Sequence, residues 1–312
     1  MTYKLNIKAQ YMRLCLVCCA LFFSLSGWGQ AQWGPNALPV IDMSSGETSE
    51  ELSVEISGSY FRGFNQSNTF TPNLRLNIPL FSRWVNLEVW YSVMDFYSMH
   101  NAQPKVLSLG EKCTMHNLTT PHSLSHWHNV AGDIYMSTNI QVLHPHWFTK
   151  QSTTSNSQLQ YIPSAVARIG IKTASGGDFE NRRFIDAPGY FLDLTLTEKI
   201  KFENSWAHSV SIAGSIGFYC WQTGRAEQND AYMYGLRTEF ETQYLQLIAE
   251  WSGYSGWQNN GDSPMCIKTH LGVPCPLGFE PYVAYQYGIR DWQYHELRIG
   301  LKYSIDIIKL NK

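Results

Sequence analysis

The chain has 312 residues, of which 44% are hydrophobic and 15% are charged, and its formal net charge is −2. A chain so close to neutral gives no electrostatic reason for a nucleic-acid partner. Beyond the first 31 residues, no stretch is long and apolar enough to form a membrane-spanning helix.

Residues 1–31 have the composition of a secretory signal peptide. Three basic residues precede the apolar run Leu14–Leu25, and small residues follow at Gly29 and Ala31. This order predicts export and cleavage after Ala31. A membrane anchor is disfavoured, because so short a run cannot cross about 30 Å of hydrocarbon. Residues 32–50 follow without periodicity and are predicted to be a periplasmic lead-in.

Residues 51–312 are predicted to form a single all-β domain. Residues 133–142 alternate strictly between polar and apolar side chains, which is typical of a strand with one wet face and one apolar face. Similar segments recur along the chain and predict about twelve strands, an even number that returns both ends of the chain to the same side. We expect the strands near residues 51–62, 72–80, 84–97, 131–143, 164–173, 189–198, 205–222, 231–241, 243–256, 264–273, 279–289 and 294–308.

Three features favour a closed transmembrane antiparallel β-barrel over a soluble β-sandwich. Most of the expected strands are about ten residues long or longer, enough to cross a bilayer at a tilt. Long connections follow odd-numbered strands at 98–130 and 174–189, whereas tight turns follow even-numbered strands, with 144–163 as the exception. Aromatic residues lie at strand ends, where lipid headgroups favour their rings. These residues are Trp84, Trp206, Trp221, Trp251, Trp257 and Trp292, with Phe240 and Tyr244 beside a turn.

The last expected strand carries a pattern that resembles the C-terminal signal read by the barrel-assembly machinery. Arg298, Gly300, Tyr303 and Ile305 fit the order polar-x-Gly-x-x-aromatic-x-hydrophobic. The chain departs from the usual form because it continues for seven residues beyond Ile305 and does not end in Phe. The pattern predicts contact with that machinery during biogenesis and with outer-membrane lipid afterwards.

Three stretches resemble a group of outer-membrane β-barrel proteins from Bacteroidetes. They are Trp33–Val40, Lys172–Leu194 and Phe279–Gly288. The resemblance implies a location in the outer membrane of a Gram-negative bacterium and the barrel fold argued above. That group is largely uncharacterised, so the resemblance implies little about activity.

Strand parity places ten charged residues toward the interior of the barrel. Their signs are mixed, so the lining either holds water and passes small polar solutes or pairs across a narrow lumen and closes it. Barrels of eight strands are filled by side chains and those of sixteen form wide channels, so we expect a constricted or closed lumen. Loop 98–130 is long enough to fold inward as a plug. The expected lumen-lining residues are Glu88, Asp133, Arg168, Lys172, Asp193, Arg237, Glu239, Glu250, Arg298 and Lys302.

Loop 98–130 is also rich in histidine, and imidazoles are ligands for zinc, copper and nickel. We favour a polar surface loop that happens to be His-rich over a metal site. No cofactor is expected. The candidate metal ligands are His116, His122, His126 and His128.

Two further features remain open. The charged loop 176–186 either binds lipopolysaccharide phosphates through its arginines or pairs with itself on the barrel mouth, which we favour. Export permits disulfides, and four cysteines follow the signal peptide. Their pairing is not fixed, although Cys113, Cys220 and Cys266 are able to meet on one rim, leaving Cys275.

These patterns favour a non-catalytic outer-membrane channel of narrow bore for small solutes, with both termini in the periplasm. The alternative is a structural or accessory subunit of a larger outer-membrane complex, which contacts other outer-membrane proteins. A lipid-modifying enzyme is the least favoured, because alternation puts His208 on the face opposite Ser209 and Ser211, so that this nearest pair of a His base and a Ser nucleophile diverges.

Overall fold

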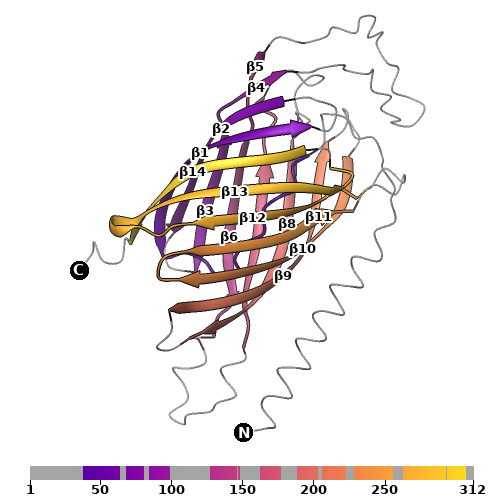
Figure 1. Cartoon of the computed structure of the whole chain (residues 1–312). Helices are drawn as coiled ribbons and strands as arrows, with labels where there is room; N and C mark the ends of the chain where they lie inside the picture. Colours follow the sequence, from indigo (N-terminus) through magenta and orange to yellow (C-terminus); the bar gives the residue numbers. More distant parts are fainter. Residues whose placement is uncertain are drawn as a thin grey trace, which may run out of the picture.

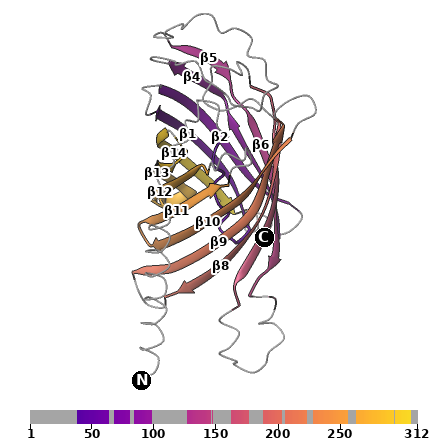
Figure 2. The same cartoon turned by 90° about the vertical axis from the view of Figure 1, so that its right-hand side faces the viewer.

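The structure, a computed structural model, describes residues 38–63, 68–80, 84–98, 127–145, 147, 162–176, 188–202, 206–222, 228–255, 263–292 and 294–306. The strands in these ranges form one antiparallel sheet, in which β1 pairs with both β2 and β14, so the sheet closes into a barrel (Figures 1 and 2). The strands are β1 (Glu51–Gly63), β2 (Asn68–Leu80), β3 (Val85–Ser92), β4 (Met94–Ser98), β5 (His128–Ala131), β6 (Ile134–Leu143), β7 (Ser164–Lys172), β8 (Gly189–Lys201), β9 (Ala207–Gln222), β10 (Gln228–Thr242), β11 (Gln246–Tyr254), β12 (Met265–Gly272), β13 (Phe279–Arg290) and β14 (Tyr294–Asp306).

The barrel wall is twelve strands wide, because β3 and β4 continue one another and so do β5 and β6. The break between β3 and β4 keeps its backbone pairing: the amide of Val93 donates to the carbonyl of Pro72, and that of Ser92 to the carbonyl of Asp133. The prediction of a single antiparallel barrel of about twelve strands is confirmed. Among the described residues, no helix has the length and hydropathy to cross a membrane.

The two ends of the barrel differ in their connections. We call the end at which β1 begins and β14 ends the turn end, and the opposite end the loop end. The connections from β4 to β5 and from β7 to β8 are both at the loop end. At the turn end, the hydroxyl of Thr242 accepts hydrogen bonds from the amides of Tyr244 and Leu245, which closes the tight turn from β10 to β11. The expected inward fold of loop 98–130 concerns residues 99–126, which lie outside the described ranges.

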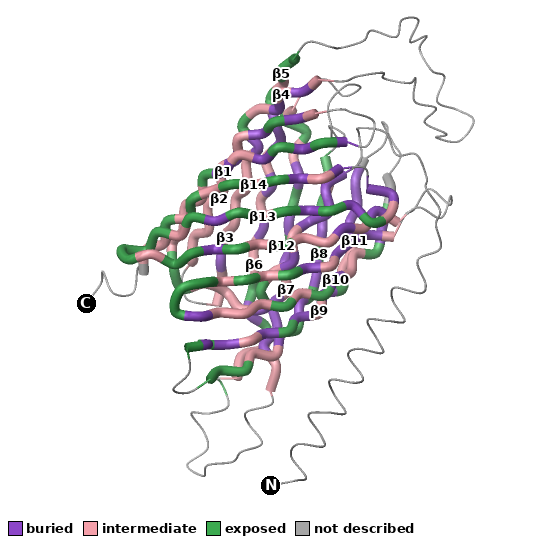
Figure 3. The backbone as a smooth tube through the Cα atoms, in the orientation of Figure 1, coloured by how far each residue is buried: buried purple, intermediate pink, exposed green. Residues whose placement is uncertain are grey.

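The wall has an apolar outer face and a polar inner face, because successive strand side chains point to opposite sides. Burial alternates along the strands, as Figure 3 shows for β13 and β14. In β6, Tyr135 and Ser137 are buried, whereas Ile140 and Val142 are exposed on the outside. The largest outward side chains include Ile56, which is 65% exposed, and Ile216, which is 70% exposed.

Residues 38–50, which we call the internal segment, run through the inside of the barrel. The hydroxyl of Tyr254 on β11 donates to the carbonyl of Leu38, and the hydroxyl of Thr197 on β8 donates to the carbonyl of Ser45. The amide group of Asn86 on β3 donates to the carbonyl of Ser49 at 2.7 Å. Tyr254 lies at the loop end of β11, and Asn86 lies at the turn end of β3. The segment therefore crosses the interior from the loop end to the turn end.

This position corrects the expectation that residues 32–50 form a periplasmic lead-in, for the described part of that range. The physical reason is that the segment is apolar at its start: Leu38, Val40, Ile41 and Met43 are each at most 6% exposed. A twelve-stranded barrel is too wide to be filled by its wall side chains alone, so burying these residues fills space that would otherwise hold water.

Candidate functional site

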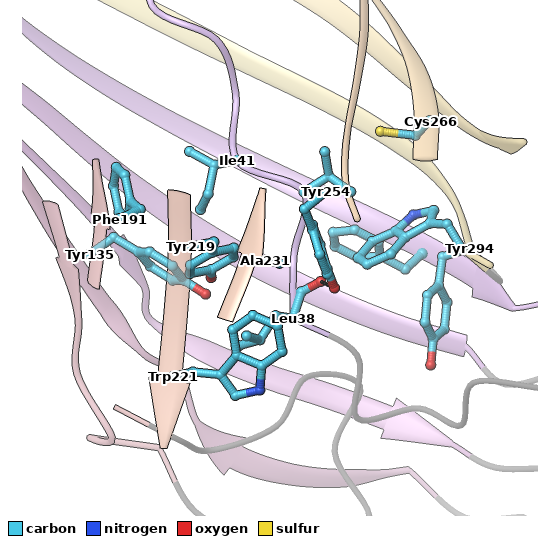
Figure 4. Packing of buried hydrophobic residues seen from close by; sticks show 13 residues of the cluster. Leu38, Ile41, Tyr135, Phe191, Tyr219, Trp221, Ala231, Tyr254, Cys266 and Tyr294 are labelled. Carbon is cyan, nitrogen blue, oxygen red and sulfur yellow. Dashed lines mark hydrogen bonds between the residues drawn. The ribbon is translucent and has the colours of Figure 1, made fainter. Parts of the chain in front are cut away.

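The loop-end half of the interior is filled by an aromatic cluster that surrounds the start of the internal segment. The Tyr219 ring lies 5.7 Å from that of Tyr254 and 5.4 Å from that of Trp221, in edge-on arrangements that aromatic pairs favour. Figure 4 shows these rings around Leu38. This half of the lumen is therefore packed like a protein core.

The cluster corrects part of the expected aromatic belt. Trp221 and Trp292 were expected at lipid headgroups, but they are only 4% and 3% exposed and belong to the interior cluster. Trp221 lies on the inward register at the loop end of β9, and Trp292 lies in the connection between β13 and β14 at the same end. Trp206 does lie outside, at 70% exposed, with its ring centre 5.6 Å from that of Phe240. Trp257 is outside the described residues.

Below the aromatic cluster, three wall cations converge on Asp42 of the internal segment. Its carboxylate lies 2.7 Å from Nζ of Lys268 on β12, 3.5 Å from Nη1 of Arg75 on β2 and 3.8 Å from Nη1 of Arg298 on β14. Lys268 also donates to the carbonyl of Val40. One carboxylate thus ties the segment to three strands.

These cations keep Asp42 ionised. Burial by itself would raise the pKa of Asp42, but Lys268, Arg298 and Arg75 together lower that pKa well below its ordinary value. The hydrogen bond from Lys268 acts in the same direction. The carboxylate therefore stays charged at any physiological pH.

The wall cations in the interior are each paired with a carboxylate of the wall itself. The pairs are Arg75–Glu88, Arg168–Asp193, Lys199–Glu241, Arg237–Glu239, Lys268–Glu250, Arg298–Glu296 and Lys302–Glu280, all with N–O distances within 3.5 Å. A further pair, Lys172 with Asp133 at 2.8 Å, is almost completely buried. Unpaired buried charges are costly, so this one-to-one pairing explains how so many charges line the barrel.

All ten residues expected to line the lumen lie on the inward face of the wall. Three pairs among them are closely joined: Arg168 with Asp193 at 2.7 Å, Arg237 with Glu239 at 2.8 Å and Lys172 with Asp133 at 2.8 Å. The others pair with residues that the sequence analysis did not single out. The structure thus places these ten residues around the whole ring rather than at one point.

Between the internal segment and the wall, a cavity of about 460 Å³ occupies the turn-end half of the lumen. Segment residues Ser44 to Ser49 line one side, and wall residues such as Glu55, Glu241 and Lys302 line the other. The cavity is polar and charged and large enough for several water molecules. The interior is therefore a packed half at the loop end and a wet half at the turn end.

The residues that sequence reasoning missed are Asp42 and the cations that hold it, Arg75 and Lys268. Strand alternation is the one signal that predicts an inward position for the two cations. Arg75, for example, lies between Leu74 and Leu76 and therefore faces away from them. The signal for the internal segment was its apolar run from Leu38 to Ile41, which is unusual for a stretch of periplasmic linker.

Of the four candidate metal ligands, the structure describes His128. His128 is exposed on β5, with its ring 5.8 Å from that of Tyr97, while His116, His122 and His126 are outside the described residues. In the described part of the chain, no group of three or more His, Cys, Asp or Glu side chains is arranged to hold a metal ion.

The cysteines that the structure describes do not form disulfides with one another. Cys220 lies on β9 and Cys266 on β12, with β10 and β11 between them, so these two do not meet on one rim. Cys113 is outside the described residues.

The candidate assembly signal lies on β14, which closes the barrel against β1. Arg298 points inward, and Gly300 lies directly under the ring of Tyr282, where a Cβ atom would come within 2.5 Å of the ring. Tyr303 and Ile305 take the outward register. The glycine of the pattern therefore has a packing role in the finished barrel.

The His and Ser side chains considered for lipid hydrolysis are not brought together in the structure. His208 is exposed on the outside of β9, whereas Ser209 and Ser211 are buried on the inside. Ser209 instead donates to a carboxylate oxygen of Glu241 at 2.5 Å. The His–Ser pair considered for lipid hydrolysis is therefore split across the wall.

The sequence matches no protein-family model and no curated protein. Among solved structures, an outer-membrane channel from Pseudomonas putida F1 matches with a TM-score of 0.53 at 10% identity, over 85% of this chain and all of that one. The KdgM porin matches with a TM-score of 0.45 at 11% identity, over 81% of this chain and 99% of its own. The NanC porin matches with a TM-score of 0.45 at 10% identity, over 81% of this chain and all of its own. At such identities, the likeness to the Pseudomonas channel shows a shared fold alone.

Proposed function

We propose that the protein is an outer-membrane β-barrel that acts as a narrow channel for small solutes, with its lumen constricted by the internal segment. The observation that carries this proposal is the pairing of an apolar outer wall with a charged, hydrated interior. Neither face alone would indicate a channel.

The outer wall supports a location in lipid. Isoleucines at Ile56, Ile216 and Ile299 are each more than 60% exposed, and contiguous apolar surface of this kind is unfavourable in water. A closed barrel leaves no unpaired strand edge, which is the condition for β-structure in a bilayer. Rings at Trp206 and Tyr244 lie near the turn end and suit a headgroup layer. The outer membrane of a Gram-negative bacterium is the compartment that fits an exported chain of this fold.

The orientation proposed is turn end in the periplasm and loop end outside, as in bacterial barrels with short periplasmic turns. This places the end of β14 on the periplasmic side, as expected for the carboxyl terminus. The internal segment runs the other way, since Leu38 lies toward the loop end, so its course gives no support to a periplasmic amino terminus. The signal peptide, the assembly role of β14 and membership of the Bacteroidetes group remain predictions.

Passage is proposed through the cavity beside the segment. The wet half admits solutes from the turn end, and the aromatic cluster limits the loop-end half. Only small solutes fit a cavity of about 460 Å³, and complete passage requires the start of the segment to shift within the cluster.

Single-channel recording in planar bilayers tests the proposal. Purified mature protein is expected to give current steps of reproducible size, and material prepared identically from cells without the gene provides the control. A mature chain that stays monodisperse in buffer without detergent would contradict the membrane location itself.

A second candidate is a structural or accessory subunit with a permanently closed lumen. The packed aromatic cluster favours it, since that half holds a core rather than a water path. Electrical silence, together with outer-membrane proteins that co-purify in stoichiometric amount, would favour this function over the channel. No catalytic role is proposed.

A further inference from the structure

The cavity carries more negative than positive charge, and the surplus can be traced to particular residues. Each cation that lines it has a carboxylate partner in the wall. Three lining carboxylates remain beyond these pairs: Asp42, Glu47 and Glu55. With the imidazole of His270 counted as neutral, nothing in the described lining offsets them.

The three surplus carboxylates differ in their surroundings. Asp42 contacts cations that are already shared with the wall. Glu55 accepts a hydrogen bond from the hydroxyl of Tyr282, which is a neutral donor. The side chain of Glu47 makes no ion pair with any described residue and lines the cavity. Glu47 and Glu55 are therefore the carboxylates most open to a solute.

We propose that this lumen takes small cations, either inorganic or amine-bearing, in preference to anions. The inference rests on the proposed function, because it names the solutes of the same lumen. A confined cavity with low-dielectric walls concentrates ions of opposite sign far more than an open surface does. Two of the three surplus charges belong to the internal segment, so the element that narrows the lumen also sets its charge.

Charged thiol reagents test the inference without requiring conduction. A cysteine at Ser53, which lines the cavity on the same face of β1 as Glu55, reports on the cavity. A cysteine at Gln243, exposed in the turn after β10, reports on bulk solvent. Cys113 and Cys275 are replaced by Ser, which leaves Cys220 and Cys266, both buried.

The measurement is the rate ratio of a trimethylammonium to a sulfonate methanethiosulfonate reagent. The ratio is expected to be about tenfold higher for Ser53→Cys than for Gln243→Cys. The double variant Glu47→Gln/Glu55→Gln should bring it down toward the bulk value. Glu198→Gln, which removes a carboxylate from the outer face of β8 between the cavity-lining Thr197 and Lys199, is the matched control and should leave it unchanged.

Equal ratios at the two cysteines, or a ratio that the double variant does not change, would overturn the cation inference. Failure of the channel proposal can be told apart from failure of the cation inference. In that case no current steps are seen, but the higher reagent ratio at Ser53→Cys is still measured. Where steps occur, the reversal potential in a potassium chloride gradient is expected on the cation side. An anion-selective reversal potential would also overturn the inference.

Discussion

Nζ of Lys268 donates a 2.7 Å hydrogen bond to Oδ1 of Asp42 and so joins β12 to a segment 226 residues earlier in the chain. This contact lies where the packed half of the lumen meets the wet half. Because Arg75 and Arg298 contact the same carboxylate, Asp42 is the main polar anchor of the internal segment.

Asp42→Asn is expected to loosen the internal segment without removing it. Hydrogen bonds to charged groups contribute about 1.5–3 kcal/mol. The fraction of molecules in which the internal segment is displaced should therefore rise about tenfold or more. In planar bilayers this appears as more frequent or larger openings. Glu198→Gln, which removes a carboxylate on the outer face of β8, should behave as the parent. Identical conductance in both variants would show that Asp42 does not hold the constriction.

The pH dependence follows from the direction of the Asp42 shift. Its folded pKa lies below the ordinary value of 3.8, so the contribution of the charged form is complete above that value and is lost only as the pH falls below it. Channel openings should therefore be the same at pH 8 and pH 5 and increase only under more acidic conditions. Asp42→Asn should lack the acid-induced increase. A transition between pH 5 and pH 7 would indicate that a different group controls the segment.

Gly46→Ala is expected to weaken docking of the segment at its turn-end half. Gly46 has a φ of +78°, which other residues rarely adopt, and a Cβ atom there would lie 1.8 Å from Oγ1 of Thr197. A penalty of at least about 1 kcal/mol is expected, equivalent to about fivefold. The reporter is Met43→Cys, whose reaction with a maleimide should be faster by that factor. Adding Thr197→Gly should relieve the clash but not the backbone strain, and it also removes the hydrogen bond from Thr197 to the carbonyl of Ser45, so only partial rescue is expected.

Lys172→Met is expected to destabilise the barrel strongly. The ion pair of Lys172 with Asp133 is buried, with the two side chains 0% and 3% exposed. Removing one partner leaves an uncompensated charge and should lower the free energy of unfolding by about 3–5 kcal/mol. Urea denaturation in phospholipid vesicles measures this. The double variant Lys172→Met/Asp133→Asn should recover much of the loss, and equal stability of single and double variants would argue against the pair.

Two arginine substitutions test which face of the wall meets lipid. Ile56→Arg puts a charge on the outside near the middle of β1 and should cost about 2–4 kcal/mol. Asn77→Arg, on the neighbouring strand, points into the cavity opposite Glu88 and should cost much less. The readout is again urea denaturation in vesicles. Equal costs would mean that the outer face is not in contact with acyl chains.

The sequence alone determined the wall of this protein. Period-2 alternation fixes which side chain of a strand faces which side, so Glu88, Arg168 and Lys302 could be placed inward before any contact was known. Strand number and the positions of the long connections followed from the same pattern. This works because alternation is a local property, set by the backbone geometry of neighbouring residues.

Only the tertiary structure decided what lies inside. Whether Asp42 meets Lys268 depends on ring closure, which brings residues together that are more than 200 positions apart. The same closure placed Trp221 and Trp292 in an interior cluster, where strand-end position alone had indicated lipid. The alternating pattern gives no information about the internal segment, because a segment that does not pair with a strand has no period-2 alternation. Its place is set by the volume that a twelve-stranded ring leaves unfilled and by the charges that the ring turns inward.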